Sequence, residues 1–170
     1  MRNVMIDIET LGLVPGSVIL SIAAVAFDQV NDDVIFDASI SVSDSIDCEM
    51  EVDDKTVEWH REIGGHALKE RDRHYRSLVD ALCDFSWAVS SDDIVWANSP
   101  SFDVVLIEAA YRTVDRPSPF FYRNLRDLRT ALAANPLFDP KSVPFVGQPH
   151  DPVDDCRHQI ALLRASGFPL

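Results

Sequence analysis

Two carboxylates near the start of the chain, Asp7 and Glu9, stand two residues apart in a short apolar run. The run's other members, Val4, Ile6 and Ile8, are β-branched, which favours an extended strand. Because a strand repeats every two residues, both carboxylates leave the same face. Two like charges side by side cost free energy unless a cation neutralises them. The stretch therefore indicates either a divalent-metal site or a solvated strand edge, and these residues alone do not separate the two.

A third carboxylate, Asp103, follows a short apolar run at residues 94–97 and a polar loop at residues 98–101. We expect a buried strand, a loop and then a helix here, which places Asp103 at a strand-to-helix junction. Such junctions form the edge of an open α/β sheet where ligands usually bind. An acid in a first helical turn is also favoured by the helix macrodipole, and for Asp103 alone this is the simpler explanation.

The segment from His150 to Asp155 brings a histidine and an acid to the start of the last predicted helix. Asp151 is a good N-cap, and Pro152 fits the first helical position, where its missing N–H is harmless. His150 then lies just outside the helix, and Asp155 lies one turn inside on a face that points back toward the N-terminus. Taken alone, His150 reads as a surface loop histidine, and Asp154 as an acid that serves the helix dipole.

Together these segments supply four carboxylates and one histidine: Asp7, Glu9, Asp103, Asp155 and His150. Carboxylates are the hard oxygen ligands that Mg²⁺ or Mn²⁺ prefers. Two such cations about 4 Å apart stabilise the attacking and the leaving oxygen of a phosphodiester. An imidazole with a pKa of about 7 can take the proton from the attacking water. The set suits two-metal phosphodiester hydrolysis.

The elements that must position these residues follow from hydrophobic patterning. The opening run, residues 18–27 and residues 34–42 read as three strands joined by short turns, which suggests an antiparallel meander. Residues 43–54 are polar and acidic and are expected to form a solvated connection. Helices are predicted over residues 55–61, 66–73, 77–89, 104–111, 124–134 and 151–165, with one further strand at 94–97 and a proline-rich loop at 138–149.

Bulk composition limits the class of protein. The 170 residues predict one α/β domain over residues 1–170, with 46% hydrophobic and 25% charged residues. No apolar run is long enough to span a membrane, and no secretory signal is visible, so a cytoplasmic protein is expected. The three cysteines are too widely spaced for a disulfide framework or zinc site. A net charge of -13 argues against coating long duplexes, but not against gripping a few nucleotides through metal ions.

In content and order, the motifs resemble the DEDDh 3′-5′ exonucleases of the ribonuclease H-like superfamily. Asp7-Ile8-Glu9-Thr10-Leu11-Gly12-Leu13 matches the first motif, Trp96 to Asp103 resembles the second, and His150 to Asp155 has the H-x4-D spacing of the third. The similarity runs from about residue 3 to residue 164. The run Arg126-Asp127-Leu128-Arg129-Thr130 is similar to a subgroup of small bacterial exoribonucleases and phage exonuclease A-like enzymes. The resemblance implies a ribonuclease H-like fold, with a central mixed five-stranded sheet flanked by helices.

The resemblance also implies roles for these residues. Asp7 would bridge two divalent ions (Mg²⁺ or Mn²⁺), Glu9 and Asp155 would complete the first site, Asp103 would support the second, and His150 would be the general base. Thr10 and Leu11 would meet the 3′-terminal nucleotide, as would Asn98. Trp59 stands where an aromatic ring can stack on a base, although packing of Trp59 against the core is an equal alternative.

The function that this resemblance implies is a metal-dependent 3′-5′ exonuclease. It would release nucleoside 5′-monophosphates from the 3′ ends of single-stranded RNA or DNA, with RNA favoured. Two enzymatic alternatives are a 3′-5′ exodeoxyribonuclease and a phosphodiesterase for small oligonucleotides. A non-enzymatic alternative is an inactive nucleic-acid-binding or assembly module, against which the intact set of five residues argues. Relatives of this size often pair, which leaves a homodimer open.

Overall fold

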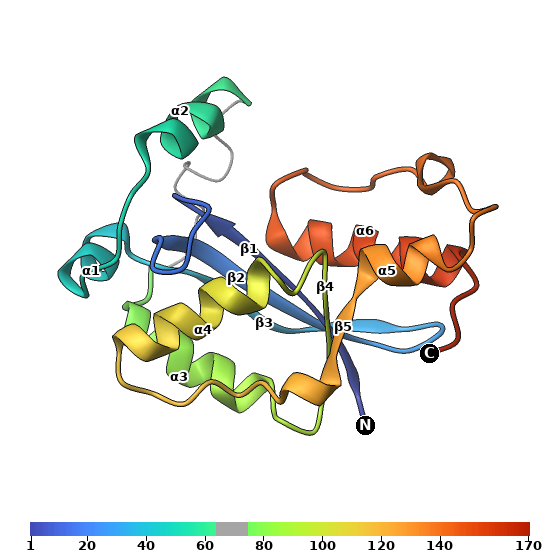
Figure 1. The fold of residues 1–170 in the computed structure, drawn as a ribbon, viewed down its shortest axis with the longest axis horizontal. Coiled ribbons are helices and arrows are strands. Elements are labelled where there is room, and N and C mark those ends of the chain that lie inside the picture. Colours follow the sequence, from blue (N-terminus) through green and yellow to red (C-terminus); the bar gives the residue numbers. More distant parts are fainter. Residues whose placement is uncertain (64–74) are drawn as a thin grey trace.

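Five strands form one mixed sheet in the computed structural model, which describes residues 1–63 and 75–170 (Figure 1). The helix predicted over residues 66–73 lies outside the described residues. The spatial order of the strands is β3-β2-β1-β4-β5. Their bounds are β1 Asn3–Thr10, β2 Ile19–Phe27, β3 Asp32–Ser39, β4 Ile94–Ala97 and β5 Leu125–Asp127.

The central strand of this sheet is β1. It pairs antiparallel with β2 over its whole length, from Asn3 opposite Phe27 to Thr10 opposite Ile19, with a bulge after Glu9. β2 pairs antiparallel with β3, so the predicted meander is confirmed. On its other side β1 pairs in parallel with β4, and β4 pairs in parallel with β5. The carboxyl ends of β1 and β4 therefore meet at one edge of the sheet.

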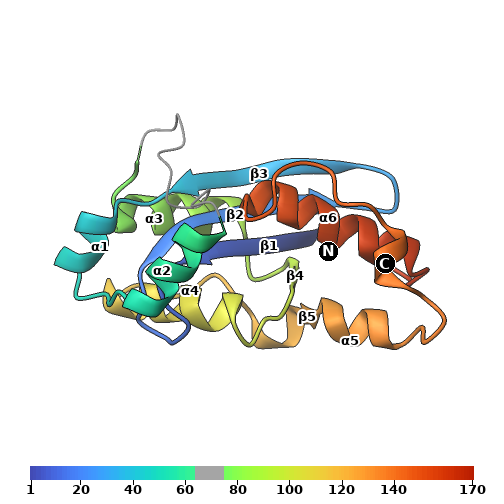
Figure 2. The ribbon, with the colours of Figure 1, turned by 90° about the horizontal axis from the view of Figure 1, so that it is seen from above.

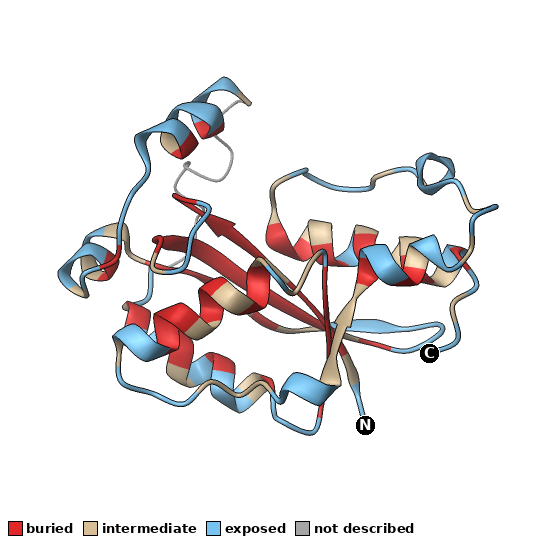
Figure 3. Ribbon diagram, in the orientation of Figure 1, coloured by how far each residue is buried: buried red, intermediate tan, exposed pale blue. Residues whose placement is uncertain are grey.

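Helices cover both faces of the sheet, as Figures 1 and 2 show. Alternation along β1 sends Val4, Ile6 and Ile8 to the face covered by α3 (Leu78–Ala88) and α4 (Asp103–Thr113). Met5 faces the other way and packs with α5 (Leu128–Ala133) and α6 (Pro152–Ala165). Figure 3 shows that burial is concentrated in the strands and in the inner sides of these helices.

Two further helices lie at one end of the molecule, α1 (Val42–Asp47) and α2 (Asp54–Glu62). The cap of α2 is Asp53, because its side chain accepts from the backbone N–H of Lys55. The α2 helix is mostly exposed, and Thr56 and His60 are its buried residues. In Figure 2, α2 lies at the carboxyl end of β1.

Two predicted elements are wrong. The third strand ends at Ser39, and α1 occupies part of the segment expected to be a solvated connection, because Ser41 caps it by accepting from the backbone N–H of Asp44. The helix predicted over residues 124–134 is divided. Asp127 accepts from the backbone N–H of Arg129, so α5 begins only at Leu128, and the preceding residues form β5 beside β4. Short 3-10 turns occupy Tyr122–Asn124 and Pro140–Ser142.

Four predicted helices and the strand predicted at 94–97 are confirmed. The helices predicted over residues 55–61, 77–89, 104–111 and 151–165 are present as α2, α3, α4 and α6. The three cysteines are free thiols. Across residues 1–63 and 75–170, no helix is long and apolar enough to cross a membrane.

Candidate functional site

A pocket of about 730 Å³ opens where the carboxyl ends of β1 and β4 meet. The four predicted carboxylates and the predicted histidine all line this pocket: Asp7, Glu9, Asp103, Asp155 and His150. Thr10, Trp59 and Asn98 line it as well. Residues from β1, α2, α4, α5 and α6 thus converge on one cavity, although they lie up to 152 positions apart in sequence, as for Asp7 and Gln159.

Asp7 and Glu9 continue the face of β1 that begins with Met5, the face covered by α6. Gln159, on α6, donates from Nε2 to Asp7 Oδ1 at 2.7 Å. One turn closer to the N-terminus of α6, the thiol of Cys156 contacts the carbonyl of Met5 at 3.5 Å. The helix is therefore tied to the strand at Met5 and at Asp7, and Asp155 in its first turn lies close to Glu9.

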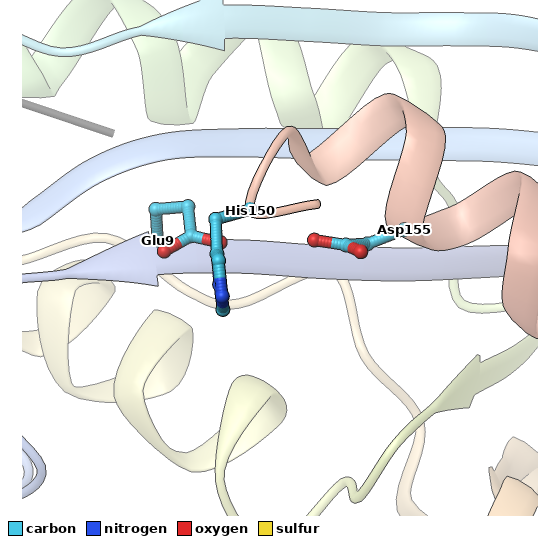
Figure 4. Close-up of side chains that lie close together, drawn as sticks. All are labelled: Glu9, His150 and Asp155. Carbon is cyan, nitrogen blue, oxygen red and sulfur yellow. The ribbon is translucent and has the colours of Figure 1, made fainter. Parts of the chain in front are cut away.

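The start of α6 carries Asp155 and the residue before its cap, His150. Asp151 is the N-cap and accepts from the backbone N–H of Val153 at 3.0 Å, as predicted from the sequence. His150 adopts a positive φ of 63° just before the cap. Its Nδ1 lies 3.6 Å from Glu9 Oε1. One ligand atom from each of Glu9, His150 and Asp155 lies within 4.8 Å of the others, as Figure 4 shows for the three side chains.

Asp103 is the first residue of α4 and is almost fully buried. Burial raises the pKa of this carboxyl to about 7, although backbone hydrogen bonds from Asp103 itself and from Ile8 oppose the rise, as does the charge of Arg129. Asp103 is thus more than a helix-capping acid, because its side chain is held among other acids in the same pocket.

The carboxylates of the pocket repel one another. Burial raises the pKa of Asp7 well above its ordinary value, and the charges of Asp103, Asp155 and Glu9 raise it further. The hydrogen bond from Gln159 acts in the opposite direction but does not offset them. Four acids and one imidazole are oxygen and nitrogen donors that suit a hard divalent cation, which would supply the positive charge this cluster lacks. The donor set therefore fits a metal site.

A second wall of the pocket comes from α2. The His60 side chain is buried and donates from Nε2 to the carbonyl of Thr10 at 2.8 Å, which fastens α2 to the end of β1. Trp59 packs edge-on against His150, with ring centroids 5.3 Å apart and planes at 88°. Trp59 is 44% exposed and lines the pocket, so packing in the core does not account for its position.

Leu11 does not reach the pocket. It is 4% exposed and belongs to the core, and its backbone N–H and carbonyl bond to Val18 and Asp53. Leu13 is instead 67% exposed and lines the pocket. Gly12 allows this turn, since a Cβ there would lie 2.3 Å from the Ser17 hydroxyl oxygen. The apolar residue at the mouth of the site is therefore Leu13, two positions after the predicted one.

Two pocket residues have no individual signal in the sequence, Gln159 and Arg129. Gln159 is an ordinary residue of an amphipathic helix until the structure places its amide against Asp7. Arg129 belongs to the run Arg126-Asp127-Leu128-Arg129-Thr130, whose only signal in the sequence is its resemblance to a subgroup of small exonucleases. Its side chain contacts Asn98, with Nε donating to Oδ1 at 3.0 Å.

Comparisons with known proteins agree with this architecture. The family model for the 3′-5′ exoribonuclease Rv2179c-like domain matches residues 2–166. A solved structure of cell-death related nuclease 4 (CRN-4) is similar at a TM-score of 0.64 and 14% identity, over 96% of this chain and 62% of that chain. At this identity the likeness shows the fold alone, and the predicted ribonuclease H-like fold is confirmed. No curated protein shows a significant match to the sequence.

Proposed function

The chain belongs to the 3′-5′ exoribonuclease Rv2179c-like domain family, and from that membership we propose that it is a metal-dependent 3′-5′ exonuclease of the DEDDh type. It hydrolyses the last phosphodiester bond at the 3′ end of single-stranded nucleic acid, with RNA preferred to DNA, and releases nucleoside 5′-monophosphates. Residues 1–170 act as one catalytic domain. The observation that carries the proposal is that all five residues of the motif set line one pocket.

Four carboxylates would hold two divalent ions, Mg²⁺ or Mn²⁺, in this proposal. Asp7 would belong to both ligand sets, Glu9 and Asp155 would complete one of them, and Asp103 would contribute to the other. The mutual repulsion that raises the pKa of Asp7 supports this assignment, because a cation removes the cause of that repulsion. When bound, such ions stabilise the charge that develops on the phosphate and on the attacking and leaving oxygens.

His150 is the general base. Its ring lines the pocket, forms a T-shaped pair with the ring of Trp59, and has Nδ1 3.6 Å from Glu9 Oε1. The imidazole takes a proton from the water whose oxygen bonds to phosphorus, and the bond from phosphorus to the 3′ oxygen breaks. The products are a nucleoside 5′-monophosphate and a strand one nucleotide shorter with a new 3′ hydroxyl.

The 3′-terminal nucleotide rests at the carboxyl end of β1. Thr10 lines this part of the pocket, and its hydroxyl donates to the carbonyl of Gly12 at 2.7 Å, which fixes the start of the turn. Leu13 and Trp59 present exposed apolar surface for the base. Asn98 also lines the pocket, within reach of the same nucleotide in this proposal. Stacking on an aromatic ring contributes about 1–3 kcal/mol per base.

Product analysis tests the proposal. RNA and DNA strands of several lengths, labelled at the 5′ end, are incubated with Mn²⁺, with Mg²⁺ and with EDTA. We expect a ladder that shortens from the 3′ end, faster on RNA, and no hydrolysis in EDTA. Asp7→Ala and His150→Ala should be nearly inactive while their circular dichroism spectra match the wild type.

Other outcomes identify the alternatives. Faster hydrolysis of DNA would indicate an exodeoxyribonuclease, and cleavage restricted to the shortest strands would indicate an oligonucleotide phosphodiesterase. Binding without hydrolysis under all conditions, or full activity of Asp7→Ala, would contradict the proposed function.

A further inference from the structure

Arg129 is a cation fixed in the pocket by a neutral partner. It stands in the first turn of α5, and Asn98 stands at the end of β4. The Arg129 Nε donates to Asn98 Oδ1 at 3.0 Å, and Nη2 donates to the Asn98 carbonyl at 3.4 Å. A long side chain held at two points has lost much of its rotamer freedom before any ligand arrives. Both residues line the pocket that holds the carboxylates.

The charge of Arg129 is not compensated by its partner. Asn98 is uncharged, and among residues 1–63 and 75–170 no carboxylate forms an ion pair with Arg129 within 4.0 Å. The charge of Arg129 does act on Asp103 and opposes the rise of its pKa, but without an ion pair. Other arginines are paired, for example Arg2 with Asp93 at 2.7 Å and Arg164 with Asp32 at 3.3 Å. The guanidinium of Arg129 therefore retains both its charge and further N–H donors for another anion.

The pocket around Arg129 is otherwise strongly acidic. The chain carries a net charge of -13, and five carboxylates line the pocket in the described part of the chain, so a nucleic-acid backbone approaches an acidic surface. Arg129 and Lys55 are the lysine and arginine residues that line the pocket in the described part of the chain. A planar guanidinium matches the geometry of phosphate oxygens better than an ammonium does.

We propose that Arg129, oriented by Asn98, binds a phosphate of the single-stranded substrate. Asn98 then acts on the substrate mainly as a positioning residue for Arg129. The inference rests on the proposed function, because it assumes a nucleic-acid substrate in this pocket. It adds a contact to the nucleic-acid backbone that is separate from the four proposed metal ligands and the proposed base.

The test compares Arg129→Gln and Arg129→Lys with Arg126→Gln as the matched control. The Arg126 side chain donates to the carbonyls of Arg123 and Leu125 and does not line the pocket. Binding of a 5′-labelled single-stranded oligonucleotide is followed by fluorescence anisotropy with Mn²⁺ in a His150→Ala background, which retains the four carboxylates but lacks the base. We expect Arg129→Gln to weaken binding about tenfold or more, and Arg129→Lys to weaken it less.

Salt dependence separates a phosphate contact from a structural effect. The slope of log K against log salt should become shallower by about 0.7 in Arg129→Gln, the value for one phosphate contact on a single strand, and should not change in Arg126→Gln. Asn98→Ala should weaken binding in the His150→Ala background and have little further effect when Arg129→Gln is also present, since both act through one contact.

Steady-state kinetics on the otherwise wild-type enzyme give an independent readout. KM for oligonucleotides should rise with Arg129→Gln more than kcat falls. Unchanged affinity and salt slope in Arg129→Gln would overturn the inference, as would a loss equal to that of Arg126→Gln. Hydrolysis by the wild type is scored separately, so an inactive wild type would refute the proposed function rather than the role of Arg129.

Discussion

The amide of Gln159 holds the carboxylate of Asp7, with Nε2 2.7 Å from Oδ1. Gln159 is nearly fully buried, and its own Oε1 has no hydrogen-bond partner among the residues that the structure describes. The contact with Asp7 connects the last helix to the centre of the first strand, and the donated hydrogen bond favours the charged form of Asp7. The position of the carboxylate proposed to bind both ions therefore depends on a residue that binds none.

Gln159→Leu should weaken the affinity for metal. We expect the Mn²⁺ concentration for half-maximal activity to rise about 10- to 100-fold, as is typical when the hydrogen-bond partner of a metal ligand is lost. Activity at saturating Mn²⁺ should recover in part. The same change at Gln29, an exposed residue after β2, is the control and should leave the Mn²⁺ requirement unchanged. A normal Mn²⁺ requirement in Gln159→Leu would show that Asp7 does not need this partner.

Asp7→Asn should stabilise the metal-free protein. Burial and the neighbouring acids raise the pKa of Asp7, so ionising this group costs the folded state free energy at neutral pH. The substitution removes the charge with little change of volume, and the melting temperature in EDTA should rise. In the wild type, Mg²⁺ or Mn²⁺ should raise the melting temperature, and this gain should be lost in Asp7→Asn. Asp92→Asn, at an exposed position, should change neither value.

The same groups determine how the stability of the metal-free protein depends on pH. Because burial raises the pKa of Asp103 to about 7, the folded state binds a proton that the unfolded state has released above its own, ordinary pKa. The resulting stability is present at low pH and is lost as the pH rises through about 7. Urea unfolding in EDTA should give a falling free energy of unfolding from about pH 5 to about pH 8. Saturating Mn²⁺ should flatten this fall, and an equal fall with metal would contradict the metal assignment.

Asp93→Asn tests an ion pair far from the pocket. Burial would raise the pKa of Asp93, but hydrogen bonds from Arg2 at 2.7 and 3.1 Å and from the backbone of Ser90 together lower it. The contribution to stability is present above the ordinary pKa of an aspartate and is lost as the pH falls through the lowered one. At neutral pH the substitution should cost about 1–3 kcal/mol in urea unfolding, and the cost should shrink in acid. A cost that does not vary with pH would contradict the charged pair.

Trp59→Ala should reduce affinity for the oligonucleotide without unfolding the protein. The ring packs on His150 at the mouth of the pocket, and the loss of one stacked base costs about 1–3 kcal/mol, or roughly a 5- to 150-fold rise in KM. Trp59→Phe should retain part of the affinity. Trp87→Ala removes a ring that is 91% exposed and does not line this pocket, and it should have no effect on KM. A fall in melting temperature with unchanged KM would favour a packing role for Trp59.

The sequence predicts the acids of the site well because their signals are local. The alternation around Asp7 and Glu9, the strand exit before Asp103 and the Asp151-Pro152 cap each depend on a few adjacent residues, and the structure brings them to one pocket. The three residues of β5 escape prediction because Leu125–Asp127 has helix-forming neighbours and becomes a strand only through pairing with β4. Tertiary pairing here overrides local propensity.

Contacts between distant segments were not predictable. Gln159 and Arg129 acquire their positions from partners at Asp7 and Asn98, which no spacing within α6 or α5 reveals. Leu13 lines the pocket in place of Leu11 for a similar reason. The bulge after Glu9 shifts the pairing with β2, so that Leu11 turns into the core and Leu13 is left at the surface.

The central place of β1 has a consequence for how the site comes apart. Asp7 and Glu9 belong to a strand with a neighbour on each side, so their amides should exchange with solvent only when the whole domain unfolds. His150 follows a long loop with little regular structure and joins the site through the first turn of α6. The proposed base can therefore leave by a local opening while the carboxylates on β1 stay in register. Hydrogen exchange would then report two separate events, a local opening around His150 and the unfolding of the whole domain. Catalysis would already fail in the local opening.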